Sequence, residues 1–296
     1  VLAKCIYSDI PVVDYYVTWK GSITTPGHSE FYQREYVDPD TVKIDFKKKK
    51  NLILVFLESM EYNFQDSVNG GNLSKNLVPE ITVYLKNEQS FIPGGTQVTG
   101  MGWTMADAVA KTCGIPLVFP PSILNSFVPL ESFLPGVTCL TDILAENGND
   151  IIVSHGSNMK FASMNVFLRT HNVSMYYDLM SYLKDERVQK DSSSNWGVKD
   201  MTLYQLVKDH IGQLADNGKP WMVWFSTIDT HTPGFLDSRC FVDSIVDEKD
   251  ELPLAVHCAS RQIDSFIKWA KSQEWFDNTV IAVMGDHAMM AAPELI

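Results

Sequence analysis

Acidic and histidine side chains follow several short apolar runs of this sequence. Glu58 follows the run 51–57, and Asp286 and His287 follow the run 279–284 and its closing glycine. Carboxylate oxygens and imidazole nitrogens are good ligands for a divalent metal ion. Each group alone is also typical of an ordinary turn beside a strand, so the recurrence of the pattern is what indicates a site.

Two further apolar runs end in the same way. His155 follows the run 151–154, and Asp229-Thr230-His231 follows the run 221–228. In open α/β sheets, ligands bind outside the carboxyl ends of the strands. We therefore expect these side chains to lie along one edge of one sheet, where they would form a site for a metal ion and a phosphate group.

A glycine-rich segment, 94–102, leads to Thr104 at the start of the helix pattern 105–111. A hydroxyl at this position is well placed to act as a nucleophile, because a helix N-terminus stabilises an alkoxide and an attached phosphoryl group. The alternative is an N-cap role for Thr104, with Asp107 completing the capping pattern. The two roles are compatible.

Apolar runs and amphipathic segments alternate along the chain. The predicted strands are 51–57, 151–154, 221–228 and 279–284, and the predicted helices are 105–111, 139–147, 160–171, 201–214 and 257–271. This order predicts an α/β fold with a largely parallel central sheet and helices on both faces. We interpret residues 1–50 as an N-terminal connector or wrapping arm, and 51–296 as a catalytic domain cut short at its C-terminal end.

Composition narrows the class of protein. The 296 residues are 45% hydrophobic and 20% charged, which is ordinary for a globular protein. A formal net charge of −12 argues against nucleic-acid binding and against broad attraction to anionic lipid. No apolar run approaches the roughly 18 residues of a membrane span. The chain opens at Val1 without a signal peptide, and we expect it to be a piece of a longer protein.

The five cysteines form no close CxxC pair. Cys113 and Cys139 flank one loop region, and Cys240 and Cys258 flank another. One hypothesis is that these four form two disulfides and leave Cys5 over, which would fit an oxidising compartment. The alternative, buried free thiols, stays open.

Together the motifs resemble those of the sulfatase-like, alkaline-phosphatase-type phosphotransferases that act on lipid head groups outside the cytoplasmic membrane. This group includes lipoteichoic acid synthases, lipid A phosphoethanolamine transferases and periplasmic phosphoglycerol transferases, and the sequence is most similar to the last. The resemblance covers most of the chain from Asn51 onward. The stretches that carry it are Leu57-Glu58-Ser59, Gly100-Met101-Gly102-Trp103-Thr104-Met105-Ala106, Cys113-Gly114-Ile115-Pro116-Leu117, Phe161-Ala162, Arg169-Thr170-His171, Trp196-Gly197, Asp229-Thr230-His231 and Gly285-Asp286-His287.

The resemblance implies a role for each matching residue. The implied metal ligands are Glu58, Thr104, Asp286 and His287, and Thr104 would also be the nucleophile. His231 and His155 would bind the phosphoryl group or protonate the leaving group. The other residues implied in substrate binding are Trp103, Lys160 and Arg169.

The sequence departs from its relatives in two places. In the synthase branch, a Trp and an Arg after the first histidine hold the glycerol phosphate, whereas Ala162 and Met164 stand near those places here. Either Lys160 or Arg169 would then replace that Arg. A sulfatase proper would need a CxPxR-type motif, and Cys113-Gly114-Ile115-Pro116-Leu117 lacks its Arg and has its Pro displaced.

The implied function is transfer of phosphoglycerol from phosphatidylglycerol, an anionic phospholipid, through a Thr104 intermediate to an acceptor hydroxyl of a periplasmic glucan or another polyol. The implied cofactor is one divalent metal, Mn²⁺ or Zn²⁺, with Mg²⁺ also compatible. The enzyme would be tethered to the membrane by segments absent from this chain and face the periplasm, with no nucleic-acid partner. The alternatives are the same chemistry on phosphatidylethanolamine, hydrolysis by a phosphodiesterase or sulfatase-like enzyme, and a non-catalytic glycerophosphate-binding domain.

Overall fold

The computed structural model describes residues 36–42, 44, 46–87, 95–98, 100–117, 130–173, 175–240 and 251–290. Its centre is a five-stranded sheet in the order β3-β2-β4-β1-β5, and every paired strand is parallel to its neighbour. The strands are β1 (Asn51–Leu57), β2 (Asp150–His155), β3 (Met175–Tyr177), β4 (Trp221–Ser226) and β5 (Thr279–Gly285). The predicted parallel α/β fold is confirmed.

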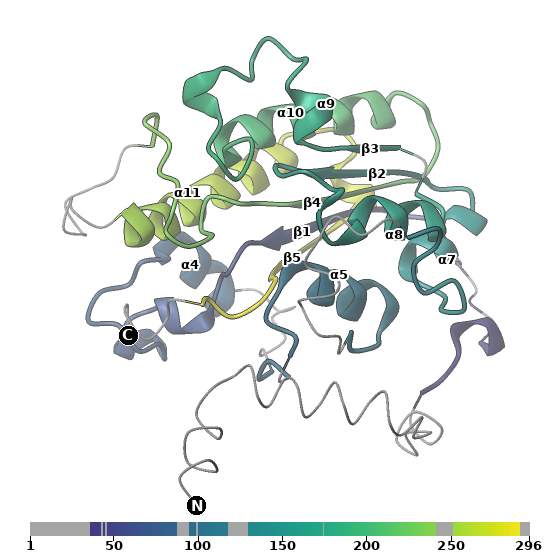
Figure 1. Ribbon diagram of the computed structural model, residues 1–296, viewed down its shortest axis with the longest axis horizontal. Coiled ribbons are helices and arrows are strands. Elements are labelled where there is room, and N and C mark those ends of the chain that lie inside the picture. Colours follow the sequence, from purple (N-terminus) through teal and green to yellow (C-terminus); the bar gives the residue numbers. More distant parts are fainter. Residues whose placement is uncertain are drawn as a thin grey trace, which may run out of the picture.

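Helices cover both faces of the sheet (Figure 1). They are α4 (Pro79–Asn87), α5 (Thr104–Cys113), α7 (Leu140–Glu146), α8 (Met164–Thr170), α9 (Leu179–Tyr182), α10 (Asp200–Ala215) and α11 (Glu251–Lys271). Short 3₁₀ turns lie at η1 (Pro39–Thr41), η2 (Tyr62–Phe64), η3 (Ser67–Asn69), η4 (Phe161–Ser163), η5 (Lys190–Ser192) and η6 (Phe276–Asn278).

Successive side chains of each strand point to opposite faces of the sheet, and a hydrophobic core lies on each face. Leu54 and Phe56 of β1 point to the face covered by α5, α7 and α8, where Trp224 of β4 joins them. Ile53 and Val55 point to the opposite face, against α10 and α11. Because both faces of β1 and β4 are buried, these strands are continuous apolar runs, which is typical of central parallel strands.

The predicted helix 160–171 is broken in the structure. Ala162 and Ser163 adopt left-handed φ angles of 52° and 56°, so that η4 ends and α8 starts afresh at Met164. The break turns the chain between the end of β2 and α8. Periodicity alone cannot show such a break, because the apolar spacing continues across it.

Two disulfides, Cys113–Cys139 and Cys240–Cys258, confirm the pairing hypothesis. The first ties the end of α5 to the start of α7. The second joins the loop after β4 to α11. No helix in the described part of the chain is long and apolar enough to span a membrane.

Most of the predicted N-terminal arm, residues 1–35, lies outside the described residues. The described part contacts the α7 side of the domain: Asp40 accepts a hydrogen bond from Thr138 at 2.9 Å, and Lys49 donates to the carbonyl of Asn147 at 2.6 Å. Phe46 packs against the core of that face. The division at residue 50 stays a prediction.

Candidate active site

Strands β1 and β5 deliver three side chains with metal-binding groups to one corner of the sheet. Leu57 pairs with Gly285 in register, so Glu58 and Asp286 leave the sheet side by side. Nε2 of His287 lies 3.5 Å from Oε1 of Glu58 and 3.4 Å from Oδ2 of Asp286. All three side chains are buried, and one ligand atom from each lies within 4.8 Å of the others.

Gly285 and Ser59 shape this corner. A Cβ at position 285 would lie 2.0 Å from the carbonyl oxygen of Met60, so only glycine fits where the two turns touch. Ser59 has a left-handed φ of 50°, and its N–H donates to Oδ1 of Asp286 at 2.7 Å. Its hydroxyl donates to Oε1 of Glu58 at 2.7 Å. An uncommon backbone conformation thus directs both donors of Ser59 at the carboxylates.

The remaining ligand atoms face one another across the corner. Nδ1 of His287 donates to the carbonyl of Ala288 at 2.9 Å, so Nε2 is the ring nitrogen directed at the two carboxylates. Burial, and then the charge of Asp286, raises the pKa of Glu58 well above its usual value. A divalent cation satisfies this arrangement, because it offsets the carboxylate charges and accepts the imidazole lone pair. The residues therefore fit a metal ion.

Helix α5 turns one face toward the same corner. Nζ of Lys111 donates to the carbonyl oxygens of Gly285 and Asp286 and lies 2.5 Å from Oδ1 of Asp107. Thr104, Asp107 and Lys111 are three and four residues apart, so they share one face of the helix. Thr104 thus lies on the same side of α5 as Lys111, which reaches the turn that carries Asp286.

Thr104 is the first residue of α5, not its cap. Trp103 occupies the N-cap position with an extended backbone and no capping side-chain hydrogen bond. The capping role considered for Thr104 is therefore wrong. The half-buried Thr104 hydroxyl lies instead at the positive end of the helix dipole, as the nucleophile hypothesis requires.

Asp107 is part of this corner, although its sequence position indicated only a capping partner. Its side chain is buried, and burial raises its pKa to about 7, against the opposing effect of Lys111. Its place in the corner comes from Lys111, which pairs with Asp107 and donates to the carbonyl oxygens of Gly285 and Asp286. The four-residue spacing from Asp107 to Lys111 was the one signal for this ion pair in the sequence.

His231 lies beside the corner on the loop after β4. Its Nδ1 donates to the carbonyl of Thr232 at 2.8 Å, which leaves the lone pair of Nε2 free in the neutral ring. Burial lowers its pKa, against the opposing effects of the hydrogen bond to Thr232 and of the nearby Asp286 carboxylate. The indole of Trp196 lies against the His231 ring, with 4.1 Å between ring centroids.

Of the other predicted substrate-binding residues, Trp103 lies at the start of α5, whereas the rest lie at the end of β2 or after it, farther along the sheet. His155 ends β2, which β4 separates from β1, and its Nδ1 accepts the N–H of Ser157 at 3.0 Å. Burial lowers the pKa of His155 to about 4. Trp103 packs its half-buried ring against the core, and Lys160 is exposed just after β2. Arg169 is exposed in the last turn of α8, at the end remote from the helix start that follows β2.

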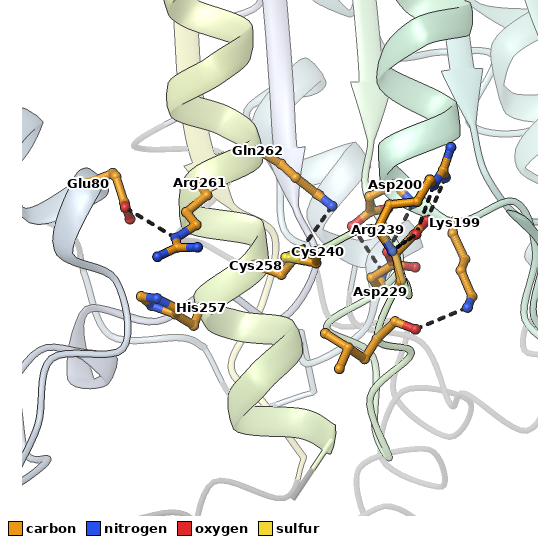
Figure 2. The surroundings of a disulfide bond; sticks show 12 residues. Glu80, Lys199, Asp200, Asp229, Arg239, Cys240, His257, Cys258, Arg261 and Gln262 are labelled. Atoms are coloured by element: carbon orange, nitrogen blue, oxygen red, sulfur yellow. Dashed lines mark hydrogen bonds and ion pairs between the residues drawn. A yellow bond between two sulfur atoms is a disulfide. The ribbon is translucent and has the colours of Figure 1, made fainter. Parts of the chain in front are cut away.

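Asp200 at the start of α10 and Asp229 in the loop that contains His231 bind each other's backbone (Figure 2). We call this pair the clasp. The N–H groups of Ile228 and Asp229 donate to the two carboxylate oxygens of Asp200 at 2.7 and 3.1 Å. In return, the N–H of Asp200 donates to Oδ2 of Asp229 at 3.0 Å. Both side chains are buried. No sequence signal joined them, because they lie on different elements 29 residues apart.

Replacing each carboxylate of this clasp by an amide should affect stability differently. Asp200→Asn replaces one of two occupied acceptors with an NH₂ group, so we expect a loss of about 1–3 kcal/mol in the free energy of unfolding. Asp229→Asn can keep its oxygen on the N–H of Asp200, and it removes a charge that burial and Asp200 disfavour. Urea denaturation of the two matched variants should show a loss for Asp200→Asn alone.

Stability should also depend on pH through this clasp. Burial raises the pKa of Asp200 from 3.8 to about 7, so the folded state binds this proton more tightly than the unfolded chain does. The free energy of unfolding should therefore be highest at acid pH and fall as pH rises through that range. Asp229→Asn should lessen the total loss, because it removes a second carboxyl whose pKa burial, and then the charge of Asp200, raise well above its usual value. An identical pH slope in wild type and Asp229→Asn would show that Asp229 does not contribute to it.

The sequence model of the Sulfatase family matches residues 50–293 of the chain. Among curated proteins, phosphoglycerol transferase I of Xanthomonas campestris pv. campestris is 30% identical over 279 residues, which cover 89% of this chain and 38% of that protein. Phosphoglycerol transferase I of Escherichia coli O6:K15:H31 is 33% identical over 248 residues, covering 82% of this chain and 31% of that protein. The chain thus spans about a third of the length of these relatives.

Solved structures share the fold. An alkaline phosphatase superfamily protein from Vibrio parahaemolyticus aligns with a TM-score of 0.62 at 22% identity, over 81% of this chain and 55% of that one. The lipoteichoic acid synthase LtaP from Listeria monocytogenes gives 0.62 at 17% identity, over 83% and 58%. The phosphoglycerol transferase GacH from Streptococcus pyogenes, in complex with sn-glycerol-1-phosphate, gives 0.53 at 16% identity, over 84% and 63%.

Proposed function

Because this chain belongs to the Sulfatase family, we propose that it is a metal-dependent phosphotransferase that moves phosphoglycerol from phosphatidylglycerol, through a covalent Thr104 intermediate, to an acceptor hydroxyl. The observation that carries this proposal is the buried group of Glu58, Asp286 and His287 beside the helix face that begins with Thr104. The names of the relatives support phosphoglycerol as the transferred group.

Glu58, Asp286 and His287, with the Thr104 hydroxyl, would hold the metal ion, and this donor set suits Mn²⁺ or Zn²⁺ and accommodates Mg²⁺. Bound there, the ion would lower the pKa of the hydroxyl and offset charge on the phosphoryl oxygens. The first-turn N–H groups of α5 form the positive end of the helix dipole, which would face the same oxygens. The geometry thus favours chemistry in which negative charge grows at Thr104.

In the first step, Thr104 gives up its hydroxyl proton to water, its Oγ bonds to phosphorus, and the bond from phosphorus to the diacylglycerol oxygen breaks. His231, protonated at Nε2 for this step, gives that proton to the departing oxygen and becomes neutral. In the second step, the neutral His231 takes the proton of the acceptor hydroxyl, which bonds to phosphorus as Thr104 leaves. The hydrogen bond from Nδ1 to Thr232 fixes Nε2 as the atom that exchanges the proton, and burial keeps the neutral form available.

The acceptor is proposed to be a glucan or another polyol at the periplasmic face of the inner membrane. The two disulfides fit an oxidising compartment of this kind. Tethering to the membrane would come from segments outside this sequence. The formylglycine chemistry of a sulfatase proper is not proposed, because Cys113 lies in a disulfide and no Arg completes its motif.

The proposal is tested with vesicles that contain either phosphatidylglycerol or phosphatidylethanolamine, with a glucan oligosaccharide and Mn²⁺ or Zn²⁺. We expect diacylglycerol release from phosphatidylglycerol and a phosphoglycerol-bearing glucan. Release from phosphatidylethanolamine alone would make the protein a phosphoethanolamine transferase. Diacylglycerol release with the head group recovered only as free glycerol phosphate would indicate a phosphodiesterase. No release from either lipid, with glycerophosphate still bound, would indicate a binding domain.

A further inference from the structure

A tight turn presents Trp196 at the active site. Ser193 and Val198 pair in an antiparallel bridge on either side of it. Within the turn, the N–H of Ser194 donates to the carbonyl of Gly197 at 2.7 Å, and Oγ of Ser194 accepts the N–H groups of Trp196 and Gly197 at 3.1 and 3.3 Å. The backbone that carries the indole is therefore fixed before any ligand binds.

The turn is also anchored to the carboxyl edge of the sheet. A Cβ at Gly197 would lie 2.3 Å from the carbonyl oxygen of Gly156, the residue that follows β2. The N–H of Val198 donates to the same carbonyl at 3.0 Å. Glycine is thus needed at position 197 for the turn to sit this close to the edge, which places Trp196 over the site.

The indole is partly covered and partly open. Its ring lies 4.1 Å from the ring of His231 at an interplanar angle of 30°, and it meets the ring of Phe161 edge-on at 6.4 Å. Even so, 38% of Trp196 is exposed. A large apolar ring is therefore held open to solvent, on a rigid support, against the histidine that is proposed to exchange protons with the acceptor.

We propose that Trp196 is the acceptor subsite, on which a pyranose ring of a neutral sugar stacks with one of its hydroxyls directed at His231. This inference rests on the proposed transferase function. A pyranose carries an apolar C–H face that matches an exposed indole, with hydroxyls around its rim, whereas a glycerol phosphate group has no such face. A net charge of −12 also suits a neutral acceptor better than an anionic one.

The test compares Trp196→Ala with the conservative Trp196→Phe. Diacylglycerol release without glucan and transfer to a glucan oligosaccharide are measured separately, because the Trp196–His231 contact can affect both. We expect Trp196→Ala to lower kcat/KM for the glucan at least about tenfold more than it lowers diacylglycerol release, through a higher KM. Trp196→Phe should recover much of this loss. Equal losses in the two assays would overturn the proposal, since Trp196 would then act only on His231 or on the lipid.

Isothermal titration with the same oligosaccharide gives a readout that needs no turnover. Wild type should bind it, and Trp196→Ala should bind it at least about tenfold more weakly. Failure of the proposed function would appear as absent diacylglycerol release in wild type, while binding still depended on Trp196. Failure of the subsite would appear as the reverse: lipid cleavage in wild type, with glucan binding absent or unaffected by Trp196→Ala.

Discussion

Thr104→Ala should lower diacylglycerol release from phosphatidylglycerol by at least about 10³-fold, because no other hydroxyl would take the place of the nucleophile on α5. The fold should tolerate the change. Thr104 is half-buried, and the cap position belongs to Trp103, so we expect less than about 1 kcal/mol of change in the free energy of unfolding. Lipid cleavage and thermal denaturation of the same preparation measure the two effects.

Thr104→Ser is the matched control for that variant. It keeps a hydroxyl at the start of α5, so it should retain measurable turnover. A Thr104→Ala protein that cleaves lipid at the rate of wild type would remove Thr104 from the mechanism. Loss of folding in Thr104→Ala but not in Thr104→Ser would point to a structural role for the hydroxyl.

Glu58→Gln should have two effects of opposite sign. It removes one carboxylate from the metal-binding group, so metal retained after dialysis should fall from about one ion per chain to near zero. In chelator, however, the variant should be more stable than wild type by about 1 kcal/mol or more, because a neutral amide replaces a buried carboxyl that Asp286 repels. Elemental analysis measures the metal, and urea denaturation measures the stability.

Asp286→Asn is the companion variant. Its amide oxygen can keep the N–H groups of Ser59 and His287, which Oδ1 of Asp286 accepts at 2.7 Å each. It should therefore fold, yet also fail to retain metal. Unchanged metal content in both Glu58→Gln and Asp286→Asn would refute the assignment of these ligands.

The central strands of the sheet could be predicted from the sequence because each is a continuous apolar run. The run 51–57 became β1 without a change of bounds, since both of its faces are buried. The edge strand β3 was missed, because three residues with exposed Met175 leave no periodic signal. The strand expected over 221–228 ends at Ser226, where Thr227 turns its N–H to the carbonyl of Phe56.

The sequence predicted which side chains gather at the corner of the sheet, but not which residues lie next to them; their role as metal ligands stays a prediction. Parallel strands end at one edge, so Glu58, Asp286 and His287 were expected along it. Only the strand order places β5 beside β1 and puts both β4 and β1 between β5 and β2, which leaves His155 farther away. Asp200 and Trp196 had no signal for their contacts, because their partners at 229 and 231 come from another element and meet them only through tertiary packing.

The most direct test of the account is the mass of the protein after incubation with Mn²⁺ and a mixture of phosphatidylglycerol and phosphatidylethanolamine, followed by peptide analysis. We expect one phosphoglycerol group per chain, located on Thr104 and absent from Thr104→Ala. An adduct on another residue, or lipid cleavage by wild type with no adduct when turnover is quenched, would contradict a covalent Thr104 intermediate.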